Sequence, residues 1–131
     1  MGHRIFFMAL ALCAGLGRPE GSAVSDIADA RTAAESNLKE KAGLDYSKAS
    51  LASFAAGQAK SFKACRDSVK APDTSRFEIF FKLSRRGTIK TSLLSPVTNV
   101  GECLLHESAK AAFPPPPGPN HWILIRSSDL P

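Results

Sequence analysis

One stretch of alternating apolar and polar residues constrains the fold of this chain more than any other feature. Apolar side chains occupy every second position from Phe77 to Leu83, a period typical of a strand with one buried face. The same alternation places Phe81 on that face and Phe80 on the other. Gly87 can adopt the positive φ of a tight turn, and Thr88–Leu94 reads as the returning strand. The sequence therefore predicts a β-hairpin.

The residues before this hairpin have helical periodicity. A first helix is predicted from Val24 to about Ala42, with a thin stripe made mostly of alanine. We expect Gly43 to end it. Ser50 is expected to begin a second helix that runs to about Val69 and has a wider apolar stripe. The N-terminal half is thus predicted to be helical.

The residues after the hairpin predict one more helix and one more strand. Asn99 is expected to cap a helix that ends near Ala112, with Glu102 closing a capping box. The proline-rich run Pro114–Pro119 suits neither a helix nor a central strand. It is predicted to be a stiff crossover that returns the chain to the sheet, where His121–Arg126 forms a third strand.

Together these elements predict the α+β class: a small two- or three-stranded antiparallel sheet packed against two helices and preceded by an extra N-terminal helix. The length of 131 residues suits one such domain. We divide the chain into a signal peptide (1–23), an N-terminal helix and linker (24–49) and an α+β domain (50–131). The expected core joins strand residues to helix residues, namely Phe77, Ile79, Phe81, Leu93 and Trp122 to Phe54, Phe62 and Leu104.

The N-terminus is typical of a secretory signal peptide. Arg4 precedes the apolar run Ile5–Ala14, and small residues follow up to Ala23. A ten-residue helix is only about 15 Å long, roughly half the hydrocarbon thickness of a bilayer, so no stable membrane span is expected. We expect cleavage after Ala23, with Gly17 as an alternative, and a periplasmic or secreted protein. Lipid modification of Cys13 is a further alternative.

Beyond the predicted signal peptide the chain carries two cysteines, Cys65 and Cys103. A pair of cysteines in an exported protein is most simply a disulfide. A metal site and a catalytic thiol are the alternatives. The same region holds two histidines, His106 and His121, and no GxSxG motif. We therefore expect no catalytic site, no bound metal and no cofactor.

The chain is basic, with a formal net charge of +5. Part of this charge gathers at the hairpin turn, on Lys82, Arg85, Arg86 and Lys90. Acidic residues are interleaved throughout, and the aromatic residues mostly occupy apolar positions rather than an exposed stacking face. We expect no nucleic-acid partner and at most a weak attraction to an anionic envelope surface.

Residues 65–126 resemble the C-terminal domain of TonB-family energy transducers, and in particular the stand-alone, cysteine-bearing periplasmic relatives. The matching features are the strand and turn glycine of Phe77–Ile89, FEIFFKLSRRGTI, the helix with Cys103 that runs into Phe113 and the prolines, and the last strand with Trp122. The transducers also have an uncleaved membrane anchor, a long proline-rich segment that crosses the periplasm and a tyrosine-proline pair before the first strand. This sequence shows none of the three, so the resemblance implies the fold rather than energy transduction.

The resulting functional prediction is an exported, non-enzymatic protein-binding module of the cell envelope. Its partner is expected to be a protein segment or an envelope component. The resemblance implies binding along the last strand, whose residues are His121, Trp122, Ile123, Leu124, Ile125 and Arg126. Proline at Ile125 would remove a donor if that amide faces the open edge. The alternative is an inhibitor or immunity-type protein that occludes an exported toxin or hydrolase.

The signal peptide leads to a direct prediction. Mass spectrometry of the exported protein should find an N-terminus at Val24, because signal peptidase cleaves after small residues such as Ala23. An intact Met1 in the exported fraction would contradict export by cleavage. An acylated N-terminal Cys13 would establish the lipoprotein instead.

Overall fold

The computed structural model describes residues 20–131, with side chains from residue 24 onward. Residues 1–19, which include Cys13 and most of the predicted signal peptide, lie outside the described residues. In chain order the elements are α1 (Glu20–Asn37), α2 (Lys41–Ser68), β1 (Glu78–Leu83), β2 (Ile89–Ser95), α3 (Asn99–Glu107), β3 (His121–Arg126) and the 3₁₀ helix η1 (Ser127–Asp129). The α+β class predicted from the sequence is confirmed.

The sheet is built around β1. Its three strands are antiparallel in the order β2-β1-β3, so that Phe80 pairs with Leu93 on one side and Leu124 on the other. The predicted hairpin is present, and its turn closes with the Gly87 N–H donating to the Ser84 carbonyl at 2.9 Å. Gly87 has a φ of +86°, a conformation that favours glycine.

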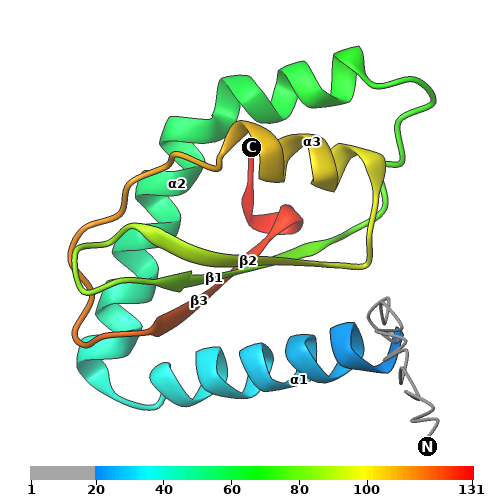
Figure 1. The fold of residues 1–131 in the computed structure, drawn as a ribbon. Helices are drawn as coiled ribbons and strands as arrows, with labels where there is room; N and C mark the ends of the chain where they lie inside the picture. Colours follow the sequence, from blue (N-terminus) through cyan, green and yellow to red (C-terminus); the bar gives the residue numbers. More distant parts are fainter. Residues whose placement is uncertain (1–19) are drawn as a thin grey trace, which may run out of the picture.

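Helices cover both faces of the sheet (Figure 1): α2 and α3 lie on one side and α1 lies on the other. On the α2–α3 side Phe81 is fully buried, with its ring centroid 5.7 Å from that of Phe54 and 5.8 Å from that of Phe113. The inward orientation predicted for Phe81 is therefore correct. Phe80 does face the opposite way, but it too is completely buried, beneath α1.

Helix α1 packs on the sheet through small side chains. Ala30 and Ala34, one turn apart, are buried, and the short alanine side chain lets a helix lie close to a strand. The Arg31 guanidinium lies 5.1 Å from the centroid of the Phe80 ring. The register places Leu93 and Trp122 on this α1 face, opposite Phe80 and Lys82. Their predicted place in the main core with Phe54 and Leu104 was wrong, because they point to the other side of the sheet.

The boundary between the first two helices differs from the prediction. α1 ends at Asn37 and α2 begins at Lys41, so the second helix starts nine residues before Ser50 and is continuous across residues 49 and 50. Gly43 does not end a helix but lies buried in the first turns of α2. A Cβ atom there would lie 1.9 Å from the Asn37 carbonyl oxygen. The glycine thus serves a close approach between α2 and the end of α1.

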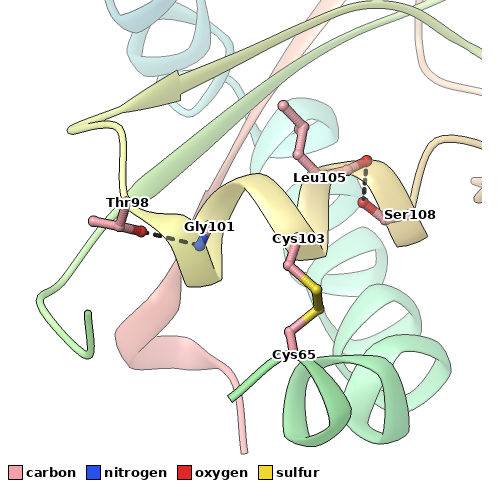
Figure 2. Close-up of a disulfide and its surroundings, with 6 residues drawn as sticks. All are labelled: Cys65, Thr98, Gly101, Cys103, Leu105 and Ser108. Carbon is pink, nitrogen blue, oxygen red and sulfur yellow. Dashed lines mark hydrogen bonds between the residues drawn. A yellow bond between two sulfur atoms is a disulfide. The ribbon is translucent and has the colours of Figure 1, made fainter. Parts of the chain in front are cut away.

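The cap of α3 also differs from the prediction. The Thr98 hydroxyl, not the Asn99 side chain, accepts a hydrogen bond from the Gly101 N–H at 2.9 Å (Figure 2). The helix ends at Glu107 rather than near Ala112. The Asn99 amide instead donates to the Ala71 carbonyl at 3.0 Å and so attaches the loop after α2 to the start of α3.

The proline-rich crossover is held at its first residues. The Phe113 N–H donates to the Gly87 carbonyl at 3.0 Å, and the Tyr46 hydroxyl donates to the Pro114 carbonyl at 2.6 Å. A Cβ atom on Gly87 would lie 2.0 Å from the Phe113 oxygen, so the turn glycine also makes room for the crossover. These contacts direct the chain from α3 into β3.

A disulfide joins the two helices on the main core side. Cys65 near the end of α2 is bonded to Cys103 of α3, with 5.7 Å between the Cα atoms (Figure 2). Cys65 is fully buried against the core that contains Phe62 and Val100. The structure pairs the two cysteines as the sequence predicted.

The disulfide should contribute much of the stability of the domain. It joins residues with a sequence separation of 38, and a closed loop of that size restricts the unfolded chain by about 4 kcal/mol in the chain-entropy model. We expect the double variant Cys65→Ala, Cys103→Ala to lose free energy of unfolding of that order in urea titration. Wild-type protein in reductant should show a comparable loss. Two free thiols in the native, unreduced protein would contradict the pairing.

Candidate functional site

Strand β3 lies at one edge of the sheet, and within residues 20–131 β1 is its sole strand neighbour. Its six residues alternate between the two faces. His121, Ile123 and Ile125 are buried in the α2–α3 side, whereas Trp122, Leu124 and Arg126 lie on the α1 side and are half-buried or exposed. The residues predicted as a binding edge therefore do form an edge strand, but half of them point into the core.

The register determines which backbone groups of β3 remain free. The Ser127 N–H donates to the Phe77 carbonyl at 2.9 Å. Because hydrogen-bonded pairs alternate along an antiparallel ladder, Ile125 and Ile123 also bond to β1. Leu124 lies between these two residues, and its N–H and C=O groups therefore point away from β1. The amide of Ile125 thus faces β1, so proline there would break the sheet rather than test the open edge.

A groove runs along this free edge. It has a volume of about 100 Å³ and separates the end of α1 from the start of α2. One wall includes Ala34 of α1 and Leu38 of the turn that follows it, and the other includes Ser47 and Leu51 of α2. Leu124 of β3 lies between these walls. We call this hollow the β3 groove.

One outward group of β3 already has a partner. The Asn37 amide, in the last residue of α1, donates to the Trp122 carbonyl at 3.1 Å. This contact confirms that the carbonyls of the even-numbered β3 residues point outward. No hydrogen bond within the described residues engages the backbone N–H or C=O of Leu124. An extended segment in the groove would meet those two groups first.

A carboxylate joins the three elements at one end of the groove. Arg31 of α1 donates to both Glu78 oxygens at 2.8 and 3.1 Å, a bidentate geometry that strengthens the pair. Arg126 of β3 approaches the same carboxylate, with its Nε 3.4 Å from Oε2. These hydrogen bonds and charges, led by Arg31, lower the pKa of Glu78, and the same pair raises the pKa of Arg31.

The two histidines lie on different elements, His121 on β3 and His106 on α3. His121 is buried, and its ring packs edge-on against Tyr46 with 5.1 Å between the centroids. This burial lowers the pKa of His121, so the imidazole is neutral near pH 7. His106 is exposed on α3. In the part of the chain that the structure describes, no three His, Cys, Asp or Glu residues gather as metal ligands.

Two other features belong elsewhere on the molecule. The disulfide lies between α2 and α3, and neither cysteine lines the β3 groove. The basic residues Arg85 and Arg86 are exposed at the hairpin turn between β1 and β2, and neither lines the groove. Among residues 20–131 no helix has the length and apolar character to cross a membrane.

Comparison with known protein families, curated proteins and solved structures finds no match to this chain. The resemblance to the TonB family therefore stays a prediction from sequence motifs. The β3 groove is defined only by its lining residues and by the register of β3.

Sequence reasoning found the strand of this site but missed its walls. Asn37, Leu38 and Ser47 lie in the segment that was assigned to a helix end and a linker. Their contribution depends on the turn at 38–40, which folds α2 back beside α1. Gly43 was the residue that could have indicated this turn, because a buried glycine inside a helix marks a close approach between two backbone segments.

The Glu78 carboxylate should make stability dependent on pH. Its pKa is lowered in the folded state, so its contribution is complete above the unfolded value of about 4.3 and is lost as the pH falls through the folded value. We expect Glu78→Gln to reduce stability at pH 7 by about 1 kcal/mol and to differ little from wild type at pH 2–3. Thermal unfolding at both pH values measures this. Asp29→Asn, an exposed change on α1, is the control, and an equal loss for both variants would contradict the role of Glu78.

Proposed function

We propose that this protein is an exported, non-enzymatic module that binds an extended segment of a partner protein along the free edge of β3. The observation that carries the proposal is the position of Leu124. Its backbone N–H and C=O point away from β1 and lie between the two walls of the β3 groove. Unpaired edge groups accept an added strand through main-chain hydrogen bonds.

The walls supply side-chain selectivity. An added strand would alternate its side chains between the two faces of the sheet. Side chains on one face would meet Ala34 of α1 and Leu38 of the turn after it, and those on the other would meet Ser47 and Leu51 of α2. Both walls favour small or apolar side chains at alternate positions of the partner. In strand addition, main-chain hydrogen bonds supply affinity and such side-chain contacts supply specificity.

Charge at the groove favours a basic residue in the partner. Glu35 and Asp129 line it and form no ion pair within the described residues. Arg126 also lines the groove, but its guanidinium is within 3.4 Å of Glu78. The net effect is an acidic surplus beside an apolar channel. A Lys or Arg that flanks the bound segment would be attracted to it.

Export is supported by two features. The N-terminal sequence has the pattern of a signal peptide, and a disulfide is typical of proteins in oxidising compartments. The predicted resemblance to the TonB family implies the same mode of binding, because its members pair their terminal strand with a receptor segment. A partner protein that is itself exported and offers an extended segment fits both the predicted export and the predicted mode of binding.

The test compares proline with alanine at Leu124. Proline removes the outward N–H and leaves the ladder to β1 intact, because the N–H of Leu124 takes no part in it. Peptides selected by wild-type protein from a displayed random library provide the ligands. We expect Leu124→Pro to weaken their binding about tenfold or more and Leu124→Ala to weaken it less. Fluorescence anisotropy measures both, with circular dichroism as the check on folding.

A second variant should strengthen peptide binding at the β3 edge instead of weakening it. Asn37→Ala frees the Trp122 carbonyl, which then becomes available to the added strand, so affinity should rise. Failure of the library to yield any peptide would overturn the proposal. Equal affinity of the Leu124→Pro and Leu124→Ala variants would overturn strand addition as the mechanism.

A further inference from the structure

A second hollow lies apart from the β3 groove and shares no residue with it. It is formed between the end of α2, the loop 73–76, the start of α3 and the C-terminal residues around η1, and its volume is about 390 Å³. Its lining includes Phe62 and Arg66 of α2, Arg76 of the loop, and Leu130. We call it the Arg66–Arg76 hollow.

The floor of this hollow is apolar. The rings of Phe62 and Phe77 meet edge to face, with 6.2 Å between their centroids, and Val100 of α3 lies beside them. All three are buried, and Leu130 is partly buried against the same core. A ligand in the hollow would therefore place an apolar part against aromatic and aliphatic carbon.

The rim carries two positively charged guanidiniums, those of Arg66 and Arg76. No carboxylate of the described residues lies within 4 Å of the guanidinium of Arg66 or Arg76. Arg66 lies over the Phe62 ring, 4.3 Å from its centroid, which positions its N–H groups beside the apolar floor. The one acidic lining residue, Asp73, accepts a hydrogen bond from the Ser75 N–H at 2.9 Å and is thereby directed to its own loop.

Polar donors complete the rim. Thr74 and Ser128 are exposed lining residues, and their hydroxyls can donate to an anion. A neighbouring hollow of about 280 Å³ shares Arg76, Phe77, Ser127 and Ser128 and continues the cavity toward Pro96, where Glu78 and Arg126 also line it. The combined space accommodates more than a single ion.

We propose that the Arg66–Arg76 hollow binds a phosphate monoester that carries an apolar chain. Two guanidiniums and nearby hydroxyls match the several acceptor oxygens of a phosphate, for which arginine is the preferred partner. Phe62, Phe77 and Val100 would hold the first carbons of the chain. Such a group occurs in soluble alkyl or acyl phosphates and in the phosphatidate headgroup of a membrane, and the experiment separates these sources.

Isothermal titration of the oxidised protein with hexyl phosphate, inorganic phosphate and hexanol tests the proposal. Hexyl phosphate should bind at least tenfold more tightly than inorganic phosphate, because two buried methylenes suffice for that factor. Hexanol should bind weakly, since it lacks the anion. Equal affinity for hexyl phosphate and inorganic phosphate, or no binding of hexyl phosphate, would overturn the proposal.

Variants assign the binding to this hollow. Arg66→Gln and Arg76→Gln should each weaken hexyl phosphate binding about tenfold, whereas Arg85→Gln at the exposed hairpin turn should not. Leu130→Ala should reduce the preference for hexyl over inorganic phosphate while leaving inorganic phosphate binding unchanged. Unaltered binding in both arginine variants would overturn the site. Leu124→Pro should have no effect here, so this result is independent of the β3 groove.

Vesicles identify the source of the phosphate. The protein is sedimented with phosphatidylcholine vesicles that contain or lack phosphatidate. Binding that requires phosphatidate and is lost in Arg66→Gln and Arg76→Gln supports the site with a membrane headgroup as its ligand. Hexyl phosphate binding without any vesicle binding supports the site with a soluble phosphate monoester as its ligand.

Discussion

The architecture depends on the burial of β1 on both of its faces. Phe80 and Phe81 are neighbours in sequence, point to opposite sides of the sheet, and are both completely buried. A strand with one apolar face needs one layer of helix, but this strand needs two. Helices α2 and α3 lie on one side of the sheet and α1 on the other (Figure 1). Phe81 packs against Phe54 of α2, and Phe80 lies beneath Arg31 of α1. The groove along β3 follows from this three-layer arrangement.

The second layer explains why an edge strand has walls. Because α1 and α2 lie on opposite faces and are joined by the short turn at 38–40, their adjoining ends flank β3 along its open side. Gly43 permits this approach, and the Glu78 carboxylate, held by Arg31 and Arg126, connects α1 to the sheet at the far end. A bare edge would pair with any exposed strand. In the proposed binding mode, the walls would restrict it to an extended segment of suitable side chains.

Charge is divided between the two proposed sites. The β3 groove is lined by two acidic residues, Glu35 and Asp129, that form no ion pair within residues 24–131, in a chain whose net charge is positive. The Arg66–Arg76 hollow carries guanidiniums without carboxylate partners within the described residues. Binding a basic segment at one and a phosphate at the other would not compete, because the two sites share no lining residue. The disulfide joins α2 to α3, the two helices that line the second hollow.

The sequence by itself determined the local elements and their order: the hairpin from its alternation and turn glycine, the crossover from its prolines, the Cys65–Cys103 pair from cysteine number, and β3 as a strand. These depend on contacts between residues near in sequence or on simple counting. Tertiary structure alone decided that Phe80 is buried, that Trp122 lies on the α1 face, that Gly43 lies inside a helix, and that the backbone of Leu124 rather than Ile125 faces outward. The physical reason is that strand register, and the docking of an alanine-rich helix, arise from long-range packing and hydrogen bonding that a local period does not encode.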